Sequence, residues 1–298
     1  MEHYLDIIIS SFTGYWNYLV SEISVNYTYK PWYENYFYLL IVLSVLVWAA
    51  ELIKPWRKKQ PMFRRDFWLD AFYMFFNFFL FSLVGYNALS NVGVELFNDF
   101  LGLFGITNLV AIEIGSWPRW LQLLTMFVVA DFIQWNTHRL LHRVDWLWEF
   151  HKVHHSVKQM GFAAHLRFHW FETIVYKSIQ YIPLAMIGFG IQDFFLVHLV
   201  AIAIGHLNHA NLDLSYGPLK YILNNPRMHI WHHAHDMPKN RQYGINFGIS
   251  LSIWDYLFKT AHVPSSGRDI ELGYEDDTLM PPSFLGQTIR PFKAIFSK

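Results

Sequence analysis

The sequence predicts an all-α integral membrane protein, with about four transmembrane helices and a cytoplasmic, histidine-rich helical cap. Three observations lead to this prediction. Of the 298 residues, 53% are hydrophobic and only 15% are charged, whereas a soluble domain is about 25% charged. Several apolar stretches approach the roughly 20 residues that a helix needs to cross a bilayer. The histidines gather in short clusters with helical spacing.

The overall charge and the cysteine count exclude several classes of protein. The formal net charge is zero, so nothing indicates a nucleic-acid-binding protein. The chain has no cysteine, which excludes disulfides, thiolate metal ligands and cysteine nucleophiles. Any metal site in this chain therefore lacks thiolate ligands.

Hydropathy divides the chain into three parts: a membrane region with two transmembrane helices (1–117), a histidine-rich region (118–262) and a polar C-terminal tail (263–298). The first 36 residues lack a basic segment and a small-residue cleavage site, so no signal peptide is expected there. An interfacial or re-entrant helix is expected over about 7–20. The tail, with its prolines and glycine, is expected to form an irregular cap.

The first transmembrane helix is predicted over 36–53, an apolar run with a single charge, Glu51. The following loop, 54–65, contains six basic residues and no acidic one. Because cytoplasmic loops are enriched in lysine and arginine, this loop is expected in the cytoplasm. A second transmembrane helix is predicted over 67–89, where Asp70 lies near the basic loop and is expected to form an ion pair with it.

Pro118 precedes a predicted helix, which agrees with the preference of proline for helix starts. The apolar part of this helix, 120–135, is expected to cross back to the cytoplasmic side. The segments 174–190 and 192–205 are predicted as a helical pair that either crosses the bilayer or turns within it. This topology brings every histidine cluster to the side of the basic loop.

Three motifs, HRLLH, HKVHH and HIWHH, contain most of the clustered histidines: His138 and His142; His151, His154 and His155; His229, His232 and His233. Residues three or four apart share one face of a helix, so each motif presents two or three imidazoles together. A lone histidine in an apolar helix is usually a core residue. Burying eight imidazoles without a cation, however, has a high desolvation cost. Imidazole suits zinc, copper, iron and nickel, and eight ligands suggest two metal ions.

These motifs, together with LRFHWFE, HAN and NFGISLSIWDYLF, resemble the fatty acid hydroxylase/sterol desaturase superfamily over about 120–260. The resemblance is greatest to alkylglycerol monooxygenase-like and bacterial sterol desaturase-like members. It implies a membrane-bound, non-haem di-iron oxidoreductase whose catalytic region is 118–262.

The resemblance also implies metal ligands beyond the three motifs. His209, in the HAN motif, matches a ligand on the helix before the last cluster. His206 is three residues earlier on the same face and is either a further ligand or lies behind the ligands. His169 is expected near the site, although Trp170 stands where the superfamily usually has proline.

Three further polar residues are expected to orient the imidazoles: Asp131, Asn211 and Asp255. Metal-bound histidines usually donate their other N–H group to a carboxylate or a carbonyl. For Asp255, a helix cap is an equal alternative. His165, His198 and His235 are not expected to be ligands.

The implied reaction is hydroxylation of a C–H bond in a fatty acyl, alkylglycerol or sterol-like lipid, with dioxygen and external electrons. The sequence contains no flavin, haem or nicotinamide motif, so the electrons would come from cytochrome b5, a ferredoxin with its reductase, or a pterin. The location would be a bacterial inner membrane or the endoplasmic reticulum. Alternatives are a lipid or sterol desaturase, a metal-binding membrane transporter and an inactive scaffold.

Overall fold

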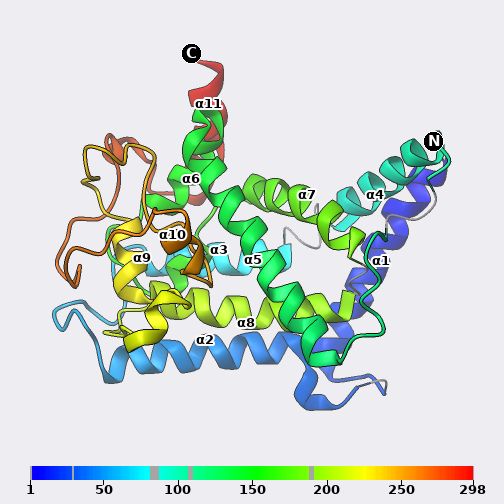
Figure 1. The fold of residues 1–298 in the computed structure, drawn as a ribbon, viewed down its shortest axis with the longest axis horizontal. Coiled ribbons are helices and arrows are strands. Elements are labelled where there is room, and N and C mark those ends of the chain that lie inside the picture. The colour runs from blue at the N-terminus through cyan, green and yellow to red at the C-terminus, as the bar shows by residue number, and fades with distance from the viewer. Residues whose placement is uncertain (1, 29, 81–86, 107–109, 188–190, 298) are drawn as a thin grey trace.

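Figure 1 shows a computed structural model of the chain, which describes residues 2–28, 30–80, 87–106, 110–187 and 191–297. Within these residues all regular structure is helical. Strand-like pairing there is confined to two isolated bridges, Leu223 with Leu251 and Ala234 with Leu272. The prediction of an all-α fold is therefore confirmed.

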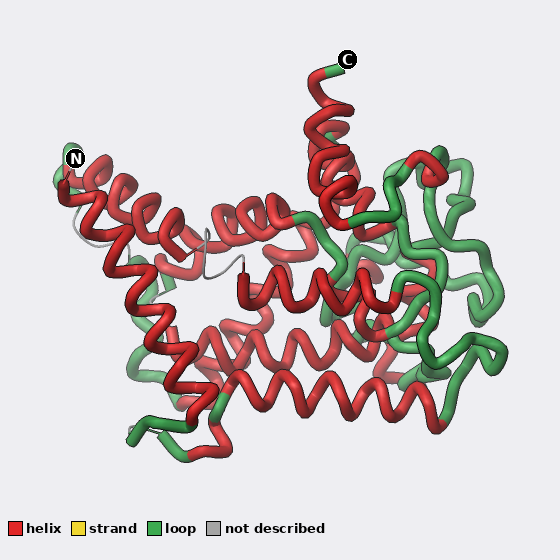
Figure 2. Tube along the Cα trace, turned by 180° about the vertical axis from the view of Figure 1, so that it is seen from behind, coloured by secondary structure: helices red, strands yellow, loops and turns green. Residues whose placement is uncertain are grey.

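The helices form two regions, one at an end of the molecule and one in its body (Figures 1 and 2). At one end, α1 (Glu2–Ser24) packs against α4 (Asn87–Gly102). In the body of the molecule, α2 (Tyr36–Ile53) lies beside α8 (Ile191–His209). Helix α1 is longer than the interfacial helix expected over 7–20.

The remaining long helices lead to the histidine-rich end of the molecule. α3 (Phe67–Phe75) continues into a π-helical segment, Phe76–Leu80. α5 (Arg119–Arg143) packs against α7 (Trp170–Met186) and against the short helix α6 (Asp145–His155). Two further short helices lie among the loops at this end: α9 (Pro226–His232) and α10 (Ile253–Leu257).

Helix α2 coincides with the first predicted transmembrane segment. Its N-terminus is capped by Asn35, whose side chain accepts a hydrogen bond from the backbone N–H of Tyr38 at 2.9 Å. Its mean hydropathy is 2.2 and only 17% of it is buried, so most of its apolar surface faces away from the protein. A helix of this length and composition is able to cross a membrane.

α2 is the single helix among the described residues that meets this criterion. The expected span 67–89 includes residues 81–86, which lie outside the described residues. The expected pair 174–190 and 192–205 corresponds to α7 and α8, with 188–190 also outside them. The number of four transmembrane helices stays a prediction.

The C-terminal tail is more ordered than the sequence analysis predicted. It ends in α11 (Phe284–Phe296), which packs against α6 and projects from the body (Figure 1). The side chain of Ser283 accepts a hydrogen bond from the backbone N–H of Gly286 and so caps this helix. The Phe284 ring lies 4.9 Å from that of Tyr73 on α3. The expectation of an irregular tail was wrong for this segment, because a capped helix with one apolar face follows the prolines.

The ion pair expected for Asp70 is present. Its carboxylate pairs with Arg64 from the basic loop and, at 3.2 Å, with Arg167. All three side chains are buried. A buried carboxylate with two guanidinium partners fixes the basic loop against the segment that follows the second histidine motif.

Candidate metal centre

The structure brings nine of the ten predicted histidine ligands into two groups. In each group the ligand nitrogens lie within 4.8 Å of one another. The five-histidine group consists of His138, His142, His151, His155 and His232. The four-histidine group consists of His154, His209, His229 and His233. The two groups are adjacent, because the rings of His155 and His233 stack at 4.5 Å.

Each H-x-x-H-H motif contributes to both groups. On α6, His151 and His155 belong to the five-histidine group and His154 belongs to the other. On α9 the pattern is reversed: the first and last histidines join the four-histidine group, and His232 joins the five-histidine group. Residues three and four positions after the first lie on its two sides, about 100° apart around the helix. The three imidazoles of each motif thus share one broad face, but they do not all join one group.

The tautomers of four imidazoles follow from their hydrogen bonds to backbone carbonyls. The Nδ1 atoms of His138 and His232 lie 2.8 Å from the carbonyl oxygens of Phe247 and Ile245, respectively. Those of the other two, His154 and His209, face carbonyl oxygens at 3.1 and 2.8 Å. A carbonyl oxygen only accepts, so each Nδ1 carries the proton and each Nε2 presents a lone pair.

These lone pairs face one another across a short distance. The Nε2 atoms of His154 and His209 are 3.3 Å apart, with no proton between them in these tautomers. Burial lowers the pKa of His154 to about 3, so an extra proton does not bind there at pH 7. Two nitrogens bound about 2.1 Å from one ion, at an angle of about 90–110°, lie about 3.0–3.4 Å apart. The pair therefore has the spacing of two ligands of one cation.

Buried nitrogens without partners provide a second indication of a cation. The Nε2 atoms of His142, His155 and His232 are buried and have no hydrogen-bond partner among the described residues. Leaving a buried polar atom unpaired costs about 1–3 kcal/mol. In the four-histidine group, Nε2 of His229 lies 3.0 Å from Nε2 of His209 and 3.2 Å from Nε2 of His233. The unpaired Nε2 atoms of one group and the closely spaced Nε2 atoms of the other fit metal ligands better than they fit a hydrogen-bonded core.

Two carboxylates from the sequence analysis hold the loop that orients the imidazoles. Asp255 accepts hydrogen bonds from the backbone N–H groups of Phe247 and Gly248, at 2.9 and 2.7 Å. Asp131 accepts hydrogen bonds from the backbone N–H groups of Ser250 and Leu251, at 3.0 and 3.2 Å. Neither carboxylate contacts an imidazole. Their expected orienting role stays a prediction, and any such role would act through the loop that carries the accepting carbonyls.

Asn211 and His169 are also placed away from the ligands. The side chain of Asn211 accepts a hydrogen bond from the backbone N–H of Arg57 at 2.9 Å, and so fixes the basic loop. The ring of His169 lies 3.0 Å from the carbonyl oxygen of Thr288 on α11. Neither side chain contacts an imidazole of the two groups, so the orienting role expected for Asn211 is not seen. His169 does lie near the site, as expected, because its backbone N–H donates a hydrogen bond at 3.2 Å to Glu172, a residue that contacts His151.

His206 lies outside both groups. One of its ring nitrogens is 3.2 Å from Ser44 on α2, and the other is 3.2 Å from His165. The His165 ring in turn lies 5.1 Å from that of His209. Of the two alternatives for His206, the structure matches the one in which it lies behind the ligands.

One carboxylate that the sequence analysis did not single out contacts a predicted ligand directly. The side chain of Glu172 lies 2.7 Å from Nδ1 of His151, and both groups are buried. Burial raises the pKa of Glu172 to about 8. A cation on the opposite nitrogen of His151 would favour the ionised carboxylate. The sequence does contain a signal that could have found this residue: Glu172 is the acidic residue of the LRFHWFE motif and lies at the start of a largely apolar helix.

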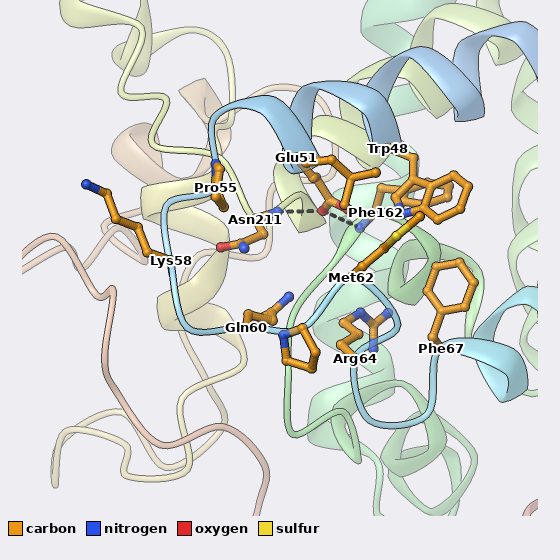
Figure 3. A pocket seen from close by; sticks show the side chains of 12 residues that line it. Trp48, Glu51, Pro55, Lys58, Gln60, Met62, Arg64, Phe67, Phe162 and Asn211 are labelled. Atoms are coloured by element: carbon orange, nitrogen blue, oxygen red, sulfur yellow. Dashed lines mark hydrogen bonds between the residues drawn. The ribbon is translucent and has the colours of Figure 1, made fainter.

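A cavity of about 270 Å³ lies at the C-terminal end of α2 (Figure 3). The rings of Trp48, Phe67 and Phe162 line one side of it. Glu51 accepts hydrogen bonds from the backbone N–H groups of Phe162 and Asn211, at 2.8 and 2.6 Å (dashed lines in Figure 3). Since Asn211 follows His209 by two residues, this carboxylate joins α2 to the segment that carries a predicted ligand.

Comparison with known proteins agrees with this geometry. Residues 123–260 match the family model described as fatty acid hydroxylase, and the matched segment contains both histidine groups. Residues 123–260 belong to the fatty acid hydroxylase family. The resemblance seen in the sequence motifs is thereby confirmed. No solved structure is significantly similar to the chain.

The relatives that the chain matches are named as lipid-modifying enzymes. The ornithine lipid hydroxylase OlsE of Rhizobium tropici is 34% identical, over 59% of this chain and 52% of that protein. The alkylglycerol monooxygenase of Xenopus tropicalis is 27% identical, over 76% of this chain and 46% of that protein. The very-long-chain aldehyde decarbonylase GL1-10 of Oryza sativa subsp. japonica is 30% identical, over 60% and 54%. The chain therefore spans about half the length of these relatives.

Proposed function

We propose that this protein is a membrane-bound oxygenase with two iron ions that hydroxylates a C–H bond of a lipid. The observation that carries the proposal is the pair of adjoining histidine groups, in each of which the candidate ligand nitrogens lie within 4.8 Å of one another. A ligand set of neutral imidazoles without thiolates suits iron. When bound, two iron ions supply the chemistry that reduces dioxygen and oxidises an unactivated C–H bond.

The residues of the chain have three roles in this proposal. The nine imidazoles hold the ions, and their buried position keeps them neutral: burial lowers the pKa of His138 to about 4. The carbonyls of Ile245 and Phe247 fix the tautomers that direct Nε2 toward the ions. Glu172 fixes the orientation of His151 in the same way. Burial of almost all ligands limits the access of water to the site.

A lipid substrate is supported by the relatives and by α2. The names of the relatives specify an ornithine lipid, alkylglycerols and very-long-chain aldehydes as substrates of those proteins. The exposed apolar surface of α2 is suited to contact with a bilayer. We further propose that the chain is multi-pass and that both histidine groups face the cytoplasm, on the side of the basic loop.

The test combines metal content with product analysis. The purified protein is expected to contain about two irons per chain, and less in His142→Ala and His232→Ala. His235→Ala is the control, because His235 is only partly buried and lies outside both groups. With dithionite, a total lipid extract and ¹⁸O₂, the unaltered protein is expected to add one labelled oxygen atom to a lipid. A metal-free protein, or a product without label, would overturn the proposal.

A further inference from the structure

Five basic side chains lie together on the surface beside the five-histidine group: Arg139, Arg143, Lys239, Arg241 and Lys259, here called the basic face. Contacts connect four of them, and Lys239 lies in the turn that the hydrogen bond from the Arg241 N–H group to the carbonyl oxygen of Pro238 closes. The Arg143 guanidinium lies over the ring of Tyr243 at 5.7 Å, and Arg241 donates a hydrogen bond to the carbonyl oxygen of Lys259. The Arg139 guanidinium lies 4.5 Å above the ring of Trp135, which contacts the residue preceding Lys259.

The basic face lacks acidic partners. None of its five cations forms an ion pair with the described residues. Three carboxylates lie nearby in sequence: Asp236 is bonded to His235, Asp255 is buried, and Asp145 is exposed at the start of α6. Asp255 nevertheless attracts the Arg139 guanidinium from inside the protein. The charge of the other four cations is available to an acidic partner.

The same elements expose apolar side chains among the cations. Tyr243, Leu257 and Phe258 are 48%, 62% and 50% exposed. Apolar residues surrounded by a charged rim are the usual composition of a protein–protein interface. The basic face therefore has the features of a docking surface for a protein rather than for a small anion.

The basic face also lies next to a member of the five-histidine group. His142 is the single member of the two groups that is not fully buried. Gly244, next to Tyr243, packs directly on it: a Cβ atom at this position would lie 3.2 Å from Nδ1 of His142. A protein bound to the basic face would be separated from a ligand imidazole by one layer of residues.

We propose that the basic face docks an acidic one-electron carrier protein, which delivers electrons to the metal centre past His142. The inference rests on the proposed function, because that reaction requires a reductant. Hydroxylation of R–H consumes one O₂, two electrons and two protons, and yields R–OH and water. Two reduced carriers, each of which loses one electron, supply this requirement. Charge complementarity of this kind accelerates association and is weakened by salt.

The test uses the full-length, iron-loaded protein and two acidic probes, a plant-type ferredoxin and cytochrome b5. The measurement is the rate at which each reduced probe is oxidised, at low and high ionic strength. With at least one probe, the double variant Arg143→Glu/Lys259→Glu is expected to slow oxidation at low ionic strength by about tenfold or more. Lys293→Glu, on α11 and exposed, is the matched control and is expected to keep the unaltered rate.

Turnover driven by dithionite separates the two proposals. Dithionite needs no docking surface, so the double variant is expected to form the labelled lipid product with it at the unaltered rate. Equal rates for the double variant and the unaltered protein with both probes, or rates that do not respond to salt, would overturn the docking proposal. A failure to form product with dithionite in the unaltered protein would instead overturn the proposed function.

Discussion

At the scale of single residues, the tautomer of each imidazole depends on a partner outside the histidine motifs. Backbone carbonyls fix four of the nine imidazoles, and a carboxylate, that of Glu172, fixes His151. A carboxylate behind a metal-bound imidazole strengthens the ligand more than a carbonyl does, because it carries a full charge. Among the described contacts, Glu172 is the carboxylate with this direct role.

We predict that Glu172→Gln weakens metal binding at the five-histidine group about 10–100-fold. Glutamine keeps the size of the side chain and loses its charge, so the fold is expected to persist. The measurement is competition for iron with a chelator of known affinity. Glu275→Gln, on an exposed residue of the tail, is expected to change nothing. An unaltered affinity in Glu172→Gln would contradict the orienting role.

At the scale of elements, the loop after α9 positions two of the grouped histidines, His138 and His232. Asp255 holds this loop by accepting hydrogen bonds from two backbone N–H groups, from Trp135 Nε1 at 3.1 Å and from Thr260 Oγ1 at 2.6 Å. The loop carbonyls then fix two ligands that come from different helices, His138 on α5 and His232 on α9. The loop thus joins two separate helices to one group.

We predict that Asp255→Ala lowers the free energy of unfolding by about 2–4 kcal/mol, since it leaves buried donors unpaired. The measurement is the midpoint of thermal unfolding in detergent, together with iron content. Iron is expected to be lost first from the five-histidine group, whose two ligands depend on the loop. Asp269→Ala removes a carboxylate that is 71% exposed and serves as the control. Equal midpoints for the two variants would show that the loop does not depend on Asp255.

The helices and most of the grouped histidines could be predicted from the sequence, because spacing along one helix is a local property. The division of each H-x-x-H-H motif between two groups could not, since it depends on how α6 and α9 face each other. Glu172 lies 21 residues from His151, and no local pattern relates the two. The roles of Asp131 and Asp255 were expected to involve imidazoles, and only the folded loop shows that their partners are backbone N–H groups.

At the scale of the whole molecule, the orientation of α2 determines on which side of the membrane the histidine groups and the basic face lie. Its 18 residues extend about 27 Å as a helix, close to the roughly 30 Å of a hydrocarbon core. The basic loop 54–65 follows its C-terminal end directly, and Glu51 joins that end to the segment after His209. If α2 crosses the membrane, the basic loop and the histidine groups must share one side.

The absence of cysteine makes this topology testable with single introduced thiols. We predict that Lys58→Cys and Arg268→Cys react with a membrane-impermeant maleimide from the cytoplasmic side, and Glu34→Cys from the opposite side. All three positions are exposed, so the expected difference reflects the membrane and not burial. Labelling is compared in sealed vesicles of both orientations, and detergent-solubilised protein, where all three must react, is the control. Reaction of Glu34→Cys and Lys58→Cys from the same side would show that α2 does not cross the bilayer.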